Sequence, residues 1–298
     1  MVAPLEERLP SWLAGVLACP VCHGALEIRT TSAECLQCGR QFPMNSGSCG
    51  FDFCPRDLFL RQDESGWEQR QDFFTAWLSA QDPVKGPEGD EDFFSVCAEK
   101  AGNIRGNVLD VGGGDGYLRR WLPGNVHYAC VDPFRYPPGR VESVFHARGE
   151  QSPELPVVLL GVGEYLPFKD RAFTTVFCLG TLNHTSRPQK VLEEISRVLV
   201  PEGTLLITIE EVPFYVPLLY LAEWRVIRKC LGSASTMLRN MWTRESRASV
   251  QPDHIPLPPV QLSRWLRSSF ELRDTFFIPS RGVVEMGRCW RKRELRGL

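Results

Sequence analysis

The sequence predicts an α/β fold in which a doubly wound parallel sheet follows a small N-terminal module. Three observations support this prediction. Short apolar runs alternate with helical patterns from residue 107 to residue 209, which is the order of strands and helices in a parallel sheet. A glycine-rich turn follows the first apolar run, at residues 112–116. Two C-x-x-C pairs precede the alternating region, and such pairs are typical of small metal-stabilised modules.

Cysteine spacing predicts a zinc ribbon in the N-terminal module. Cys19 and Cys22 form one C-x-x-C pair, and Cys35 and Cys38 form a second pair after twelve intervening residues. Two such knuckles offer four thiolates in the tetrahedral arrangement that Zn²⁺ prefers. The odd total of eleven cysteines, in a chain without a basic secretory leader, argues against a disulfide framework. We expect a structural site, because so small a segment gains much of its folding free energy from the metal.

The elements of both parts are expected in a regular order. Short ribbon strands are predicted near residues 26–28 and 41–43, and helical stretches within residues 61–100. Strands of the main domain are predicted at 107–111, 126–132, 157–161, 172–179 and 204–209, each a short apolar run. Helices are predicted at 117–122, 188–199 and 258–266, and a closing antiparallel strand pair at 271–278 and 283–290.

The chain divides into three predicted parts. Residues 1–58 are expected to form the zinc ribbon, and residues 59–104 an acidic helical segment that could cover part of the ligand cleft. Residues 105–298 are expected to form the main domain, with an insertion at about 211–258. A net charge of −2 excludes the strong basic excess of a general nucleic-acid binder. No apolar run is long enough for a transmembrane segment, so we expect a cytoplasmic protein.

The glycine loop indicates the kind of cofactor. Its pattern from Asp110 is D-x-G-x-G-x-G, with glycines at 112, 114 and 116. The dinucleotide fingerprint would need a glycine where Tyr117 stands. Asp110 suits a cationic amino group. Asp132 ends the second strand, where a carboxylate can accept both hydroxyls of a ribose, whether the ligand is NAD or S-adenosylmethionine.

Four motifs in the expected order resemble class I S-adenosylmethionine-dependent methyltransferases, close to their type 11 group. They are residues 108–116 (VLDVGGGDG), 161–173 (GVGEYLPFKDRAF), 179–184 (LGTLNH) and 201–205 (PEGTL). The resemblance covers residues 105–210 closely and implies a seven-stranded Rossmann-like sheet that binds S-adenosylmethionine. The cofactor-binding residues that it implies are Asp110, Gly112, Gly114, Gly116, Asp132, Gly163, Glu164 and Leu179.

Two positions depart from the family pattern. The aspartate that commonly receives the adenine amino group is Val162 here, and the Phe-Asp pair before the fourth strand is Phe173-Thr174. Adenine recognition would then rest on backbone groups around Gly163 and Glu164 and on packing against Val162.

Methyl transfer from a sulfonium mainly requires alignment of the acceptor, and in some cases removal of a proton. His184, which follows the fourth strand, is the first candidate base, and His254 is the second. The alternative for His184 is a histidine that only shapes the cleft. In the insertion, residues 214–230 are apolar on one face. We favour a helix packed on the domain, and the alternative is a lid that meets a lipid-like acceptor or a membrane surface.

Three functions remain open from the sequence. The first is a methyltransferase for a small-molecule acceptor, such as a lipid, quinone, sugar or secondary metabolite. The second is an rRNA or tRNA methyltransferase that uses the zinc ribbon to recognise RNA. It is disfavoured because only Arg29 and Arg40 are basic between Cys19 and Cys49. The third is a non-catalytic interaction protein that keeps the fold.

Overall fold

The computed structural model describes large parts of the predicted zinc ribbon and of the predicted main domain. The described residues are 9–44, 51–59, 71–74, 91–136, 139–141, 156–209, 257, 259–280 and 283–294, with the single residues 69, 76 and 80. The insertion predicted at about 211–258 lies outside the described residues except for Leu257, and His254 lies outside them as well.

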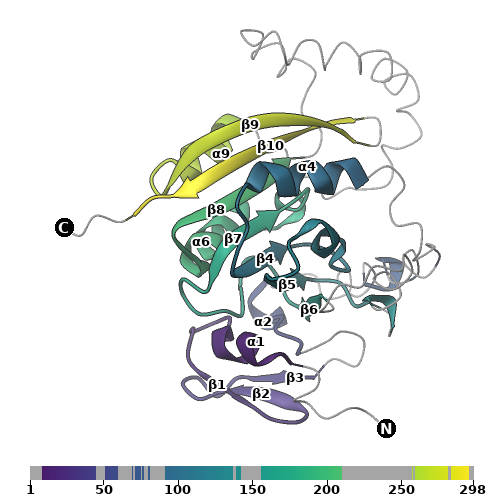
Figure 1. Ribbon diagram of the computed structural model, residues 1–298. Coiled ribbons are helices and arrows are strands. Elements are labelled where there is room, and N and C mark those ends of the chain that lie inside the picture. Colours follow the sequence, from purple (N-terminus) through teal and green to yellow (C-terminus); the bar gives the residue numbers. More distant parts are fainter. Residues whose placement is uncertain are drawn as a thin grey trace, which may run out of the picture.

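A seven-stranded sheet forms the centre of the main domain (Figure 1). Its strands are β4 (Asn107–Val111), β5 (His127–Asp132), β6 (Val157–Leu160), β7 (Phe173–Cys178), β8 (Leu199–Ile209), β9 (Phe270–Ser280) and β10 (Val283–Lys292). Their spatial order is β6-β5-β4-β7-β8-β10-β9. β10 is antiparallel to β8 and β9, and the other neighbouring strands are parallel. The predicted doubly wound, seven-stranded sheet is confirmed.

The winding of the sheet reverses between β4 and β7. β4 pairs with β5 on one side and with β7 on the other, so the connections that leave β4 and β7 diverge. In open α/β sheets, ligands bind at this switch point, beyond the carboxyl ends of the strands. The glycine loop at residues 112–116 begins at the carboxyl end of β4 and is therefore in the position that a cofactor loop requires.

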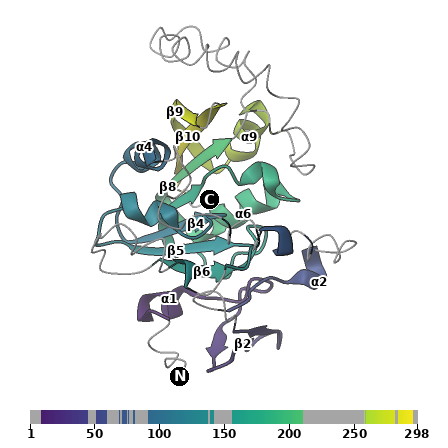
Figure 2. The same ribbon diagram turned by 90° about the vertical axis from the view of Figure 1, so that its right-hand side faces the viewer.

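Helices cover both faces of the sheet (Figure 2). On one face, α4 (Glu91–Ala101) and the 3₁₀ helix η2 (Tyr117–Trp121) bury Phe93, Cys97 and Leu118 against the strands. On the other face, α6 (Pro188–Val198) and α9 (Pro259–Leu266) bury a second set of apolar side chains. α6 has this role because its apolar residues recur at helical spacing, at 191, 192, 195 and 198.

Two elements differ from the sequence prediction. The helix predicted at 117–122 is a 3₁₀ helix, which begins directly after Gly116 in a left-handed conformation. β8 begins at Leu199, five residues before the predicted start at 204. Leu199 pairs with Phe173, the register then shifts, and Glu202 adopts a φ of +62°. The Pro-Glu-Gly sequence is therefore accommodated as an irregularity inside the strand.

The N-terminal module is a three-stranded antiparallel sheet of β1 (Leu26–Ile28), β2 (Ser32–Cys35) and β3 (Gln41–Pro43). β1 and β3 confirm the predicted ribbon strands, and β2 was not predicted. The short helices α1 (Ser11–Val16) and α2 (Arg56–Phe59) flank it. The module shares one apolar core with the main domain, because Leu13, Phe42 and Phe53 belong to the same buried cluster as Phe168 and Leu159.

Backbone pairing also joins the ribbon to the sheet. The N–H of Phe53 donates to the carbonyl of Leu160 at 2.8 Å, and Asp52 forms a parallel bridge with Leu160 at the outer edge of β6. The N–H of Ala18 donates to the Pro167 carbonyl at 3.0 Å. Within the described residues, no helix is long and apolar enough to cross a membrane.

Candidate functional site

The four ribbon cysteines lie together. Their Sγ atoms are all within 4.8 Å of one another, with Cys19 and Cys38 at 3.8 Å and Cys22 and Cys35 at 3.4 Å. A tetrahedral zinc site with Zn–S bonds of about 2.3 Å has S···S edges of about 3.8 Å. The donor set and its spacing therefore fit Zn²⁺, as the C-x-x-C pairs predicted.

Backbone N–H groups of each knuckle favour the thiolate, but in the first knuckle burial raises the pKa of Cys19 to about 12 and also raises that of Cys22. The N–H of Cys38 points at the Sγ of Cys35 at 3.5 Å. Burial opposes ionisation of Cys35, but the N–H groups of Cys38 and Gln37 and the neighbouring thiols lower its pKa to about 7. A left-handed residue follows each pair, His23 with φ +59° and Gly39 with φ +71°.

The glycine loop is shaped by three left-handed residues, Gly112, Gly114 and Gly116, with φ of +73°, +65° and +81°. At Gly112, a Cβ atom would lie 2.2 Å from the side chain of Thr181. At Gly116, it would lie 2.7 Å from Pro156. Larger residues are excluded at both positions, so Gly112 stays close to the segment after β7, and Gly116 stays close to Pro156, just before β6.

Asp132 is connected directly to this loop. Its Oδ2 accepts a hydrogen bond from the N–H of Gly114 at 3.0 Å, and its Oδ1 accepts one from the N–H of Phe134 at 3.0 Å. Burial raises the pKa of Asp132 to about 6, although these two N–H groups favour the carboxylate. The hydroxyl of Tyr136 also favours this carboxylate. A carboxylate offers about four acceptor positions, so about one remains for a hydroxyl donor such as that of a ribose, and a second if the Tyr136 hydroxyl turns away.

Asp110 lies beneath the loop. A Cβ atom on Gly113 would lie 2.3 Å from the Oδ2 of Asp110, and this same oxygen accepts a hydrogen bond from the hydroxyl of Tyr128 at 2.8 Å. Within the described residues, the buried Oδ1 has no hydrogen-bond partner. Burial raises the pKa of Asp110 to about 7. An unpaired acceptor at this position fits a cationic group directly or through a water molecule.

The residues after β6 and β7 complete the surroundings. The carboxylate of Glu164 accepts from the Ser186 hydroxyl at 2.9 Å and from the Arg187 N–H at 3.2 Å, so it holds the start of α6. Gly163 is packed closely, since a Cβ atom there would lie 3.0 Å from Val191. Val162 is buried beside it. Because the Glu164 carboxylate already bonds to Ser186 and Arg187, the backbone groups of Gly163 and Glu164 are better placed than this carboxylate to bond to an adenine.

The candidate base His184 lies at the same end of the sheet. It is exposed and ends the short 3₁₀ helix η3 (Leu182–His184), which follows Leu179 and β7. The backbone N–H of His184 donates to the backbone carbonyl of Thr181. The hydroxyl of Thr181 in turn donates to the carbonyl of Gly112 at 3.3 Å. Thr181 therefore contacts the glycine loop, and His184 lies one 3₁₀ turn further along the chain.

Sequence reasoning missed Tyr128 and Thr181. Tyr128 lies in the middle of a predicted apolar strand, and nothing in the pattern shows that its hydroxyl would meet Asp110 on the neighbouring strand. Thr181 lies inside the LGTLNH motif, whose position after the fourth strand could have indicated it.

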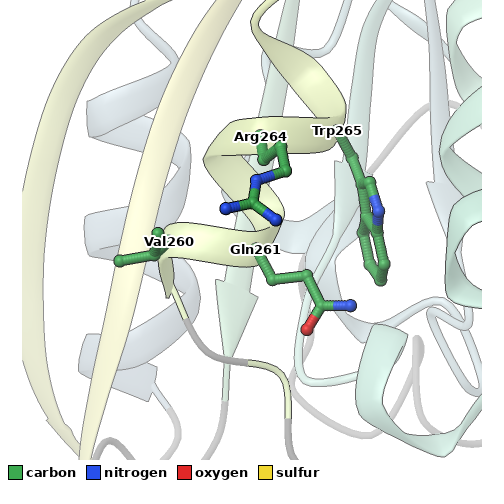
Figure 3. A pocket seen from close by; sticks show the side chains of 4 residues that line it. All are labelled: Val260, Gln261, Arg264 and Trp265. Carbon is green, nitrogen blue, oxygen red and sulfur yellow. The ribbon is translucent and has the colours of Figure 1, made fainter.

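A separate surface hollow lies on α9 (Figure 3). It has a volume of about 320 Å³ and is lined by Val260, Gln261, Arg264 and Trp265. None of the sequence-predicted site residues lines it.

Comparison with known proteins identifies the kind of domain that carries this site. Residues 109–207 match the family model of a methyltransferase domain. The chain is 32% identical over 103 residues to a glycine/sarcosine/dimethylglycine N-methyltransferase of Actinopolyspora halophila, which is 34% of this chain and 18% of the relative. It is 31% identical over 162 residues to a tRNA U34 carboxymethyltransferase of Methylococcus capsulatus, which is 53% of this chain and 42% of the relative. The matches thus span less than half the length of either relative.

Two solved structures share the fold. A 1,6-didemethyltoxoflavin-N1-methyltransferase of Burkholderia thailandensis superimposes with a TM-score of 0.52 at 15% identity, covering 87% of this chain and 98% of that one. A chain of the complex between the Haloferax volcanii Trm112 methyltransferase activator and a methyltransferase has a TM-score of 0.52 at 16% identity. It covers 76% of this chain and 99% of that one.

Proposed function

We propose that this chain, which carries a class I S-adenosylmethionine-dependent methyltransferase domain, transfers methyl groups to a small-molecule acceptor. One observation carries the proposal: the N–H of Gly114 in the glycine loop donates to the buried carboxylate of Asp132 at the end of the next strand. This bond joins the loop after β4 to the end of β5, and a nucleoside bound at the carboxyl ends of these strands would contact both.

Each part of the cofactor has a candidate partner. Asp132 accepts the ribose hydroxyls with its remaining lone pairs. The unpaired Oδ1 of Asp110 faces the amino group, and the backbone of Gly112, Gly114 and Gly116 allows close approach of the ligand. Gly163, Glu164 and Leu179 border the adenine, the first two through their backbone.

S-adenosylmethionine, when bound, supplies a methyl group on a positively charged sulfur, which is already a good leaving group. The protein then mainly aligns the acceptor with that methyl group. His184 is exposed at the end of η3, in the segment that follows β7, where it can take a proton from an attacking O–H or N–H. His254 is the second candidate for this role. Replacing His184 with Asn should leave cofactor affinity unchanged, and it should slow transfer only if the acceptor must lose a proton.

The ribbon is proposed to hold Zn²⁺ through Cys19, Cys22, Cys35 and Cys38, as a structural site with no step in the reaction. All four positions of a tetrahedron are taken by protein thiolates, so no position remains for a substrate. Metal analysis of the purified protein tests this, with one zinc per chain expected.

RNA is the second candidate acceptor, because the tRNA U34 carboxymethyltransferase relative matches over half of this chain. The ribbon offers little to a phosphate backbone. Arg29 pairs with Glu34 at 2.9 Å, and Arg40 makes two hydrogen bonds to Asp57 at 2.8 and 2.9 Å. Both basic residues between Cys19 and Cys49 are therefore neutralised by acids, which favours a small-molecule acceptor.

Two measurements test the proposal. Calorimetry with S-adenosylhomocysteine should show binding in the micromolar range, and its absence would support the third possibility, a non-catalytic interaction protein. A salt-dependent gel shift with total RNA should show no binding. If RNA binds with a steep salt dependence, RNA becomes the preferred acceptor. Incubation of labelled S-adenosylmethionine with a fractionated lysate then identifies the pool that receives the methyl group, including lipids.

A further inference from the structure

Gln71 joins a segment before α4 to the loop that follows β5. Its side chain is buried, with 2% of its surface exposed. The Nε2 donates to the carbonyl of Pro133 at 2.7 Å, and the Oε1 accepts from the N–H of Arg135 at 3.0 Å. One side-chain amide therefore bonds to the backbone on both sides of Phe134, as a neighbouring strand would.

Phe134 lies between these two hydrogen bonds and contacts Asp132 directly. Its N–H donates to the Oδ1 of Asp132 at 3.0 Å. Its ring stacks on Phe74, with ring centroids 3.8 Å apart and an interplanar angle of 20°. Phe74 also meets the edge of Tyr136, at 6.2 Å and 88°. Gln71 thus fixes the backbone of the loop, and Phe74 fixes its aromatic side chains.

These contacts bear on the cofactor through Asp132. The carboxylate orientation depends on two backbone N–H groups, of Gly114 from the glycine loop and of Phe134 from the loop after β5. The φ angles of Gly112, Gly114 and Gly116 set the first group. The second belongs to the loop that follows β5, at residues 133–136. Gln71 and Phe74, which lie outside the sheet, both contact this loop.

We propose that Gln71 and Phe74 are positioning residues for the cofactor, which hold the Phe134 N–H against Asp132 and so keep its carboxylate aimed at the ribose. This inference rests on the proposed function. Neither residue is expected to touch the cofactor, and their effect passes through the Phe134 backbone.

The test uses the full chain and S-adenosylhomocysteine as the probe. Gln71→Met keeps the length of the side chain and removes both hydrogen bonds, and Phe74→Ala removes the stack on Phe134. We expect each to weaken binding about tenfold, the effect of losing one or two buried interactions. The matched control is Phe73→Ala, because the adjacent Phe73 ring is 64% exposed. It should bind like the unaltered protein.

A second probe separates positioning from general damage to the fold. An analogue of S-adenosylhomocysteine without the 2′ and 3′ hydroxyls cannot use Asp132. Gln71→Met should therefore bind this analogue as well as the unaltered protein does. Amide hydrogen exchange adds a readout without ligand: the N–H groups of Phe134 and Arg135 should exchange at least tenfold faster in Gln71→Met, and not in Phe73→Ala.

The outcomes are distinguishable. If the unaltered protein does not bind S-adenosylhomocysteine, the proposed function fails and the inference fails with it. If it binds, and Gln71→Met binds equally well or loses the same factor with both probes, this inference alone is overturned. If the loop exchanges no faster in Gln71→Met, the coupling through Phe134 is overturned.

Discussion

The hydroxyl of Tyr128 donates a 2.8 Å hydrogen bond to the Asp110 carboxylate between two neighbouring strands of the sheet. Both residues are buried, and the second oxygen of Asp110 has no hydrogen-bond partner among the described residues. The pair therefore places a titratable carboxyl group directly under the glycine loop, and among the described residues only one of its two oxygens accepts a hydrogen bond. This arrangement is expected to affect both stability and cofactor binding.

Tyr128→Phe should destabilise the protein by about 1–3 kcal/mol, because it removes the one described hydrogen bond to a buried carboxyl. The hydrogen bond from Tyr128 favours the carboxylate, so its removal raises the pKa of Asp110 further. Urea denaturation measures the change, and the loss should be larger at pH 8 than at pH 5. An equal loss at both pH values would show that Asp110 does not titrate between them.

Stability should fall as the pH rises from about 4 to about 7. The pKa of Asp110 is raised from 3.8 to about 7 and that of Asp132 to about 6, in both cases mainly by burial. Between the unfolded pKa of 3.8 and the raised folded pKa, the folded protein holds a proton on each aspartate that the unfolded chain has released. The free energy of unfolding therefore falls as the pH rises, by up to about 1.4 kcal/mol per pH unit for each group. Urea unfolding at several pH values checks this. Asp110→Asn should make the pH dependence less steep, and an unchanged slope would contradict the assignment.

Gly112→Ala should cost more stability than Gly102→Ala. Both glycines have left-handed backbones, with φ of +73° and +78°, so each substitution carries about 1–2 kcal/mol of backbone strain. A Cβ atom on Gly112 would collide with Thr181, whereas one on Gly102 would meet nothing within 4 Å. We expect about 2–5 kcal/mol for Gly112→Ala in thermal or urea unfolding. Equal costs would show that Thr181 moves aside freely.

Cys35→Ser should remove the bound zinc and destabilise the whole chain in a single transition. The ribbon and the main domain share one apolar core through Leu13, Phe53 and Phe168, so loosening the ribbon exposes the side of the sheet on which it packs. Metal analysis and differential scanning calorimetry measure the two effects. Cys54→Ser is the control, because Cys54 lies outside the four-cysteine cluster. It should keep its zinc, and two separate transitions in Cys35→Ser would show that the ribbon unfolds independently.

Most of the fold could be predicted from the sequence, for identifiable reasons. Buried parallel strands leave continuous apolar runs, and β6 is buried at all four positions. The strand β2 was missed because it has four residues and only Ala33 and Cys35 of them are buried. The early start of β8 was missed because Pro201 and Gly203 normally end an element, and here they lie in an irregular part of a strand.

The site was predictable where a motif fixes the backbone, and less so where side chains meet across the fold. The sequence analysis assigned Gly112, Gly114 and Asp132 to the same cofactor, and in the structure the N–H of Gly114 bonds to Asp132. The bonds of Gln71 to the loop after β5 span more than sixty residues. The periodicity of a sequence does not predict which polar side chain bonds to a distant backbone segment. This contact could therefore be identified only from the structure.

The pairing of Asp52 and Phe53 with Leu160 has a practical consequence for expression of the main domain alone. A fragment that starts at residue 105 would leave the Leu160 carbonyl, at the end of the edge strand β6, without this backbone partner, and would expose the apolar surface that Phe53 now covers. Exposed strand edges of different molecules tend to pair through their free backbone groups. Such a fragment should self-associate more readily than the whole chain, which size-exclusion chromatography of the two proteins would measure.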